Sequence, residues 1–167
     1  MATTNSFDVT TGADLQEVDN AVNQTMKEVQ QRYDFKGSKC EVVFDRAKSV
    51  LTLDADDDYK MTALYDILQT KFIKRGVPIK NMKKGPLIPT SGGHVRQEVT
   101  LAQGIESEIA KKIVKDVKAS GQFKKVQVAI QGDQLRVTSP SKDELQAVMA
   151  FLKGEDYGIE LNFGNYR

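Results

Sequence analysis

The sequence predicts an α+β protein made of two tandem ferredoxin-like domains, each with the element order βαββαβ. The same succession of strand-like and helix-like hydrophobic patterns occurs twice in 167 residues, at an interval of about 80 residues. Two Pro and three Gly interrupt every periodic pattern between the two copies, in 85–93. We therefore expect a first domain at 1–84, a linker at 85–93 and a second domain at 94–167.

The elements of the first half follow from local patterns. Apolar and polar residues alternate in the strands, whereas apolar residues recur at spacings of three and four in the helices. A polar turn separates two short β-rich runs, as in a hairpin. Acids 56–58 suit the start of the second helix, and basic residues mark its end before Gly76. The expected elements are a strand at 6–10, a helix at 15–33, strands at 41–45 and 50–54, a helix from 56 to 75 with Met61, Leu64, Leu68 and Phe72 in the core, and a short strand at 79–82.

The second half shows the same order with different residues. A four-residue apolar ladder reaches the terminator Gly121, and Gly132 marks a hairpin turn. Ser141 and Glu144 have the spacing of a capping box, and Gly154 ends the helix that they start. The expected elements are a strand at 95–101, a helix at 105–117, strands at 126–130 and 135–138, a helix at 141–152 and a strand at 159–163.

The composition argues against several classes of protein. No apolar run approaches the roughly 20 residues that cross a bilayer, and the N-terminus has no apolar signal region, so we expect a cytoplasmic protein without membrane contact. The one cysteine, Cys40, and the one histidine, His94, cannot form an internal disulfide or a standard structural zinc site. We expect a monomer.

Catalytic motifs are also absent from the sequence. His94 lies beside the expected linker and is best explained as a solvated loop residue, and Cys40 as a small apolar residue at a strand edge. No Gly-x-Gly or Walker A loop occurs. A metal-dependent phosphohydrolase using the acids 56–58 is an alternative, but a helix start explains these residues better. We therefore expect a protein that is not an enzyme and that needs no metal or cofactor.

Charge is distributed unevenly along the chain. Residues 71–125 contain 13 Lys or Arg and four acids, although the net charge of the whole chain is +1. Such a segment would attract phosphates, or it could simply solubilise helix ends and loops. On the outward faces of the expected strands lie Thr52, Asp54, Arg136 and Thr138, which offer no aromatic platform for RNA bases. RNA could instead meet the basic stretch 74–84.

One local cluster, residues 32–39, interleaves two aromatics with three cations. Such a set can hold a nucleotide, with a ring or guanidinium stacked on the base and cations on the phosphates. Alternatively, the cluster is a helix end with Tyr33 and Phe35 in the core and Gly37 in a turn. The two interpretations are compatible, because Phe35 can pack while Lys36 extends into solvent.

Motifs over nearly the whole chain resemble those of the bacterial YajQ family. They include Ser6-Phe7-Asp8, Arg32-Tyr33-Asp34-Phe35-Lys36-Gly37, Lys74-Arg75-Gly76, Gly104-Ile105-Glu106-Ser107, Ile130-Gln131-Gly132-Asp133 and Phe163 to Arg167. The resemblance implies that the two ferredoxin-like domains exchange N-terminal strands: 6–10 would join the second sheet and 95–101 the first. It also implies nucleotide binding. Some members that the chain resembles are cyclic di-GMP effectors that bind a transcription regulator and its DNA.

These observations lead to two functional hypotheses. The first is a non-catalytic, regulatory protein that binds GTP, ATP or cyclic di-GMP in a basic cleft between the halves. Its expected nucleotide-binding residues are Arg32, Lys36, Lys74, Arg75 and Arg96. Arginines read guanine edges best, but the Arg-x-x-x-Arg and Arg-x-x-Asp spacings of other cyclic di-GMP receptors are absent. The alternative is an RNA-binding protein, tRNA-binding or ribosome-associated, that uses the basic stretch.

Overall fold

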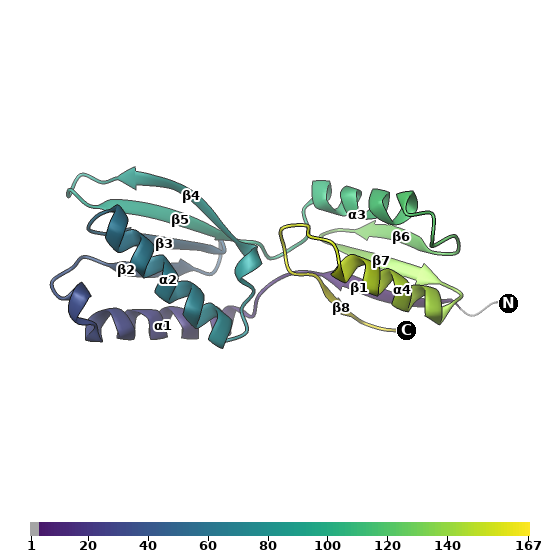
Figure 1. The fold of residues 1–167 in the computed structure, drawn as a ribbon, viewed down its shortest axis with the longest axis horizontal. Helices are drawn as coiled ribbons and strands as arrows, with labels where there is room; N and C mark the ends of the chain where they lie inside the picture. Colours follow the sequence, from purple (N-terminus) through teal and green to yellow (C-terminus); the bar gives the residue numbers. More distant parts are fainter. Residues whose placement is uncertain (1–3) are drawn as a thin grey trace. The chain divides into compact units, whose positions relative to one another are not determined.

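Two four-stranded antiparallel sheets, each covered by two α-helices, form the part of the chain that the structure describes (Figure 1). The structure is a computed structural model that describes residues 4–167. Its elements are β1 (Asn5–Thr10), α1 (Leu15–Gln31), the 3-10 helix η1 (Tyr33–Phe35), β2 (Glu41–Asp45), β3 (Val50–Ala55), α2 (Asp58–Lys74), the 3-10 helix η2 (Ile79–Asn81), β4 (Met82–Pro89), β5 (Val95–Leu101), α3 (Ser107–Ala119), β6 (Gln127–Gln131), β7 (Gln134–Ser139), α4 (Lys142–Lys153) and β8 (Asn162–Gly164). The predicted α+β duplication is confirmed.

The sheets exchange strands as the family resemblance implied. One sheet has the order β2-β3-β5-β4 and the other β6-β7-β1-β8, so β5 and β1 are both internal strands. Val99 on β5 lies opposite Leu51 on β3. Phe7 on β1 lies opposite Val137 on β7. Each of these four side chains is fully buried, which fixes the register of the exchanged strands.

The exchange makes one compact unit an insertion in the other. Residues 12–103 form one unit, here called the inserted unit, and residues 4–11 together with 104–167 form the flanking unit. The inserted unit is continuous in sequence. The flanking unit takes its internal strand β1 from one side of the insertion and its remaining elements from the other.

The structure corrects the expected linker at 85–93. Residues 85–89 are the second half of β4, and the pairing of β4 with β5 shifts register between Lys84 and Leu87. β4 is an edge strand, where a bulge can accommodate Gly85 and Pro86. A turn closed by a bond from the Thr90 N–H to the His94 carbonyl, 2.8 Å, leads into β5. The Gly and Pro residues therefore mark a bulged hairpin, not a boundary between domains.

Helices α1 and α2 cover one face of the inserted unit's sheet. Asp14 and Asp57 cap them by accepting hydrogen bonds from the Gln16 and Lys60 N–H groups, at 2.9 and 2.8 Å. Asp56 accepts from the Lys39 N–H, 2.8 Å, so the acids 56–58 serve the helix start and the preceding loop. The four predicted core residues of α2 are confirmed as buried. The fully buried side chains of this core include Leu51, Leu53, Leu64, Leu68, Phe72 and Val99.

Helices α3 and α4 cover the flanking unit's sheet in the same way (Figure 1). Ser141 caps α4 by accepting from the Glu144 N–H at 3.3 Å, as the capping box predicts. Two short strands differ from expectation. Residues 79–81 form η2, and the last strand is 162–164, so only residues 162 and 163 of the expected 159–163 strand pair with β1. No helix in the described part of the chain is long and apolar enough to cross a membrane.

Candidate functional site

The five residues expected to bind nucleotide all lie in the inserted unit, but not on one surface. On β5, Gln97, Val99 and Leu101 are buried beneath the helices, so Arg96 points to the opposite, open face of the sheet. There its Nε lies 2.7 Å from the Asp54 Oδ1. This hydrogen bond raises the pKa of Arg96. Arg96 is thus separated by the sheet from the expected residues on α1 and α2.

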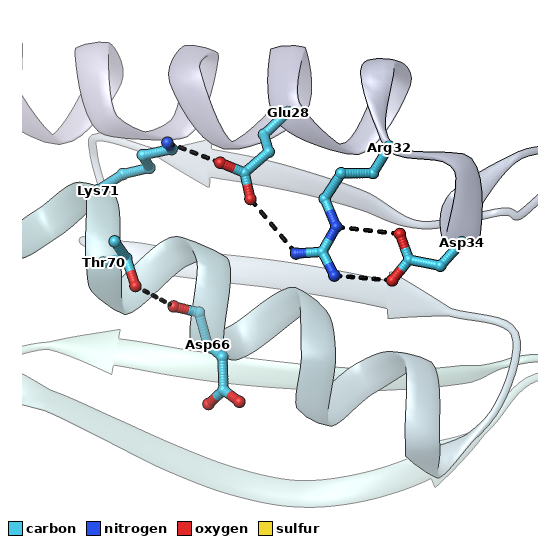
Figure 2. Close-up of polar contacts among 6 residues, drawn as sticks. All are labelled: Glu28, Arg32, Asp34, Asp66, Thr70 and Lys71. Carbon is cyan, nitrogen blue, oxygen red and sulfur yellow. Dashed lines mark hydrogen bonds and ion pairs between the residues drawn. The ribbon is translucent and has the colours of Figure 1, made fainter.

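Arg32 lies between two carboxylates at the end of α1 (Figure 2). Its Nη2 is 2.7 Å from the Asp34 Oδ2, and its Nη1 is 3.4 Å from the Glu28 Oε2. Glu28 also accepts from the Lys71 Nζ of α2 at 2.8 Å. The hydrogen bond from Arg32 lowers the pKa of Asp34, and the bond from Lys71 lowers that of Glu28. A phosphate at Arg32 would therefore compete with acids already in place.

Lys74 and Arg75 line a shallow groove of about 440 Å³ between α1 and α2, here called the α1–α2 groove. Arg75 is paired, with its Nε 2.8 Å from the Glu17 Oε2. Lys71 is paired with Glu28, as described above. Two of the four lining cations, Lys71 and Arg75, are therefore paired with acids, whereas the described structure contains no ion pair of Lys27 or Lys74. The remaining lining residues are Gln24, Lys27 and Gln31.

The aromatic and basic cluster that follows α1 divides between core and surface. Phe35 is buried, with the Arg32 Cζ and the Lys60 Nζ 5.2 and 5.1 Å from its ring centroid. Gly37 has φ 74° in a turn. Tyr33, expected in the core, is 87% exposed, because α1 ends at Gln31 and η1 turns Phe35 inward instead. Lys36 is exposed beside this turn.

A deeper cavity lies in the flanking unit, between α4, the start of β1 and the segment that follows β8. This cavity, here called the α4 pocket, has a volume of about 640 Å³. Such a volume is within the usual range for small-molecule sites. Its helix wall comes from side chains at spacings of three and four on α4. The lining residues are Asn5, Ser6, Phe7, Lys142, Leu145, Gln146, Met149, Ala150, Lys153, Tyr166 and Arg167.

The α4 pocket combines aromatic surface with positive charge. Phe7 is fully buried in the pocket wall, and the ring of Tyr166, 63% exposed, lies 6.4 Å from it between centroids. Three cations, Lys142, Lys153 and Arg167, line the cavity, and no acid is found among the lining residues that the structure describes. Aromatic faces and cations are the two features that a base and its phosphates require.

The pocket cations occupy two ends of α4. Arg167 exchanges backbone hydrogen bonds with Ser6, at 3.2 and 3.0 Å, and Asn5 donates to the Pro140 carbonyl at 3.4 Å, just before α4 starts. Lys142 and Arg167 therefore lie toward the same end. Lys153 is eleven residues further along α4, roughly 16 Å at 1.5 Å per residue. Its Nζ lies 5.6 Å from the centroid of the Phe163 ring.

A buried polar cluster on the opposite face of the sheet fixes the segment that carries Tyr166. Asp8 is 5% exposed and accepts from the Arg136 Nε at 3.0 Å and from the Asn165 Nδ2 at 2.6 Å. The bond from Arg136 lowers the pKa of Asp8. Asn165 adopts φ 55°, a left-handed conformation that turns the chain before Tyr166. Asp8 thus orients one wall of the α4 pocket without lining it.

Sequence reasoning missed the α4 pocket because its walls come from three distant segments. Asn5 and Phe7 reach α4 only through the exchanged strand β1. Lys142 and Lys153 look like ordinary helix-end residues in sequence. The one available signal was that the family-like motifs 6–8 and 163–167 both carry aromatics. In space, Phe7 and Phe163 meet edge to face, with ring centroids 5.9 Å apart.

Comparisons with known proteins agree on one family. A family model described as "Nucleotide-binding protein YajQ-like" matches residues 5–167. A protein named "Nucleotide-binding protein" from Geotalea uraniireducens is 51% identical over 162 residues, 97% of this chain and 98% of its own length. One of the same name from Desulforamulus reducens is 47% identical over 167 residues, 100% and 99% of the two chains. The chain therefore belongs to the YajQ-like family.

Proposed function

We propose that this protein binds a nucleotide without turning it over, and that the α4 pocket holds the ligand. The observation that carries the proposal is the meeting of Tyr166, Lys142 and Arg167 in one cavity of about 640 Å³ with no acidic lining residue in the described structure. The relatives named above carry the name nucleotide-binding protein, which supports the same ligand class. The five residues expected from the sequence support it less, because most are already paired with acids.

In this proposal the base stacks on the exposed face of Tyr166 and the phosphates meet Lys142 and Arg167. Stacking on an aromatic side chain contributes about 1–3 kcal/mol per base. Arg167 is the lining guanidinium, so it could bind a phosphate with two hydrogen bonds or read the O6 and N7 atoms of guanine. The described lining residues carry no side-chain carboxylate, imidazole or thiol.

We infer that the bound nucleotide regulates another protein, since a nucleotide that is bound without turnover can act only by changing what the protein contacts. GTP, ATP and cyclic di-GMP are the candidate ligands, and a transcription regulator is the candidate partner. Cyclic di-GMP has two guanines, so it would need a second group for guanine reading besides Arg167; Gln146 in the pocket wall can supply an amide.

Equilibrium binding of GTP, ATP, cyclic di-GMP and a tRNA, at low and at physiological salt, tests this proposal. The pocket variant Lys142→Ala/Arg167→Ala should weaken nucleotide binding by at least about tenfold, since each charge-assisted contact contributes roughly 1.5–3 kcal/mol. The matched control Lys27→Ala/Lys74→Ala removes two lysines from the α1–α2 groove and should leave affinity unchanged. If only the control variant loses affinity, the α4 pocket is not the site.

RNA binding by the basic stretch 74–84 is the competing function, and the same experiment separates it. Lys74 and Lys80 are exposed, whereas the Lys84 Nζ lies 3.8 Å from the centroid of the Tyr65 ring. RNA binding through backbone phosphates should fade steeply with salt and should be displaced poorly by mononucleotides. Binding of tRNA alone, abolished by Lys74→Ala/Lys80→Ala, would replace the nucleotide proposal with the RNA one.

A further inference from the structure

Strand β6 forms an open edge of the flanking unit's sheet. In the described structure it pairs only with β7, so its other side presents backbone N–H and C=O groups. Four of its five residues are exposed, and Ile130 is 44% exposed. Edge strands are normally protected by a charge, a proline or a covering element. The sequence of β6, Gln-Val-Ala-Ile-Gln, contains neither charge nor proline.

A basic groove runs beside this edge, between β6 and α3. It has a volume of about 500 Å³ and is here called the α3–β6 groove. Its lining residues are Lys111, Val114, Lys115, Lys118, Ala119 and Ile130. The three lysines recur at spacings of four and three, so they lie along one side of α3. No acid is found among the described lining residues, and Asp116 is engaged elsewhere by the Tyr157 hydroxyl at 2.9 Å.

The equivalent edge in the inserted unit is protected. There β2 occupies the position of β6, and α1 that of α3. The Met26 Sδ of α1 lies 3.4 Å from the Val42 N–H and accepts from it, which covers the outer side of the strand. β2 also carries an exposed acid at each end, Glu41 and Asp45. The open edge of β6 is therefore not required by the fold, since the other copy of the same fold closes it.

We propose that the α3–β6 groove binds an extended acidic segment of another protein by addition of a strand to β6. The backbone of the segment would continue the sheet, as in other complexes formed by strand addition. Every second side chain of the added strand would face α3. Three such positions span about 13 Å, and the lysines at 111, 115 and 118 span about 10 Å of helix, so three acidic side chains can each approach one lysine.

The choice of an acidic peptide over other anions rests on the edge itself. A nucleic acid or a membrane surface would contact the lysines but would not continue the sheet by pairing with the N–H and C=O groups along the edge of β6. A peptide uses both, because its backbone can pair with β6 while its acidic side chains reach the lysines of the groove. This site is separate in its lining residues from the α4 pocket, so it stands whether or not a nucleotide binds there.

A capped, fluorescein-labelled peptide Glu-Val-Glu-Val-Glu-Val-Glu tests the proposal by fluorescence anisotropy with the full chain. The variant Lys111→Glu/Lys115→Glu should weaken binding by at least about tenfold through charge reversal. The matched control Lys124→Glu/Lys125→Glu changes two exposed lysines that do not line the groove, and should retain at least most of the affinity. Circular dichroism should show that both variants keep the wild-type fold.

Two backbone-modified peptides distinguish strand addition from simple charge attraction. Alternate N–H groups of a strand point to opposite sides, so one peptide carries N-methyl groups on its odd-numbered residues and the other on its even-numbered residues. One of the two should lose binding at least about tenfold, because only one set of N–H groups can face β6. Equal binding of both methylated peptides and the parent would overturn the proposal. So would an RNA oligomer or an anionic vesicle that depends on Lys111 and Lys115 while the peptide does not bind.

Discussion

Replacing Val9 by alanine measures which sheet β1 stabilises. Val9 is fully buried in the flanking unit, opposite Leu135 on β7 and Phe163 on β8. Val99 is its counterpart on β5, also fully buried, in the inserted unit. The two substitutions are chemically identical. Each removes two methyl-sized groups worth about 0.8 kcal/mol apiece and leaves a small cavity, so each should cost about 2 kcal/mol.

Native-state hydrogen exchange gives the location of that loss. A loss of about 2 kcal/mol speeds exchange about 30-fold for amides that exchange by unfolding of their unit. Val9→Ala should therefore accelerate the amides of β7 and leave those of β3 within about twofold, although Val9 is closer in sequence to β3. Val99→Ala should accelerate hydrogen exchange of the β3 amides and leave that of the β7 amides unchanged. Acceleration of β3 by Val9→Ala, with β7 unchanged, would refute the exchange of strands.

Three further predictions concern stability. The Arg136 hydrogen bond lowers the pKa of Asp8, so Asp8 stabilises the fold above about pH 4, and that contribution is lost as pH falls through the native pKa. In urea titrations, Asp8→Asn should lower the free energy of unfolding by about 2 kcal/mol at neutral pH. The variant should also show a weaker dependence of that free energy on pH in the acid range. Burial, with a bond to Asp116, raises the pKa of Tyr157, so its contribution to the stability of the fold is lost as pH rises above about 10. Tyr157→Phe should therefore reduce the loss of stability with rising pH in the alkaline range. The fragment 12–103, which contains every strand of its sheet, should fold alone by circular dichroism and show a cooperative thermal transition, and a non-cooperative melt would contradict the insertion.

Elements with strong local periodicity could be predicted from the sequence. Helix α2 was predictable because Met61, Leu64, Leu68 and Phe72 recur on one face and all are buried. Tyr33 was placed in the core because its spacing continues that of α1. The backbone leaves the helix at Arg32, where ψ is 133°, and the 3-10 turn buries Phe35 instead. Periodicity indicates which face a residue shares while the helix lasts, but it does not indicate where the helix ends.

The partner of β1 could not be predicted from its own residues. Alternation in 6–10 shows that Phe7 and Val9 share a face, but any sheet with an apolar layer would accept them. The family resemblance implied the exchange of strands, and the pairing of β1 with β7 and β8 shows how the flanking unit's sheet accepts Phe7 and Val9. The basic segment 71–125 shows the same limit for charge. Its residues divide between two units, so a sum along the sequence does not describe a surface.

The two copies of the fold differ at the edge strands of their sheets. In the inserted unit, β4 has eight residues, and the Lys84 Nζ on its helix side lies 3.8 Å from the centroid of the Tyr65 ring of α2. In the flanking unit the equivalent strand, β8, has three residues, and the chain beyond it carries Tyr166 into the wall of an open cavity. At the opposite edge of the sheet, Met26 covers the outer side of β2, whereas the α3–β6 groove leaves the outer side of β6 open. The inserted unit joins its helices by ion pairs from Lys71 to Glu28 and from Arg75 to Glu17, whereas no acid is found among the described lining residues of the α4 pocket and the α3–β6 groove. Ligand binding should therefore be concentrated in the flanking unit, and charge-reversing substitutions there should alter binding more than the same changes in the inserted unit.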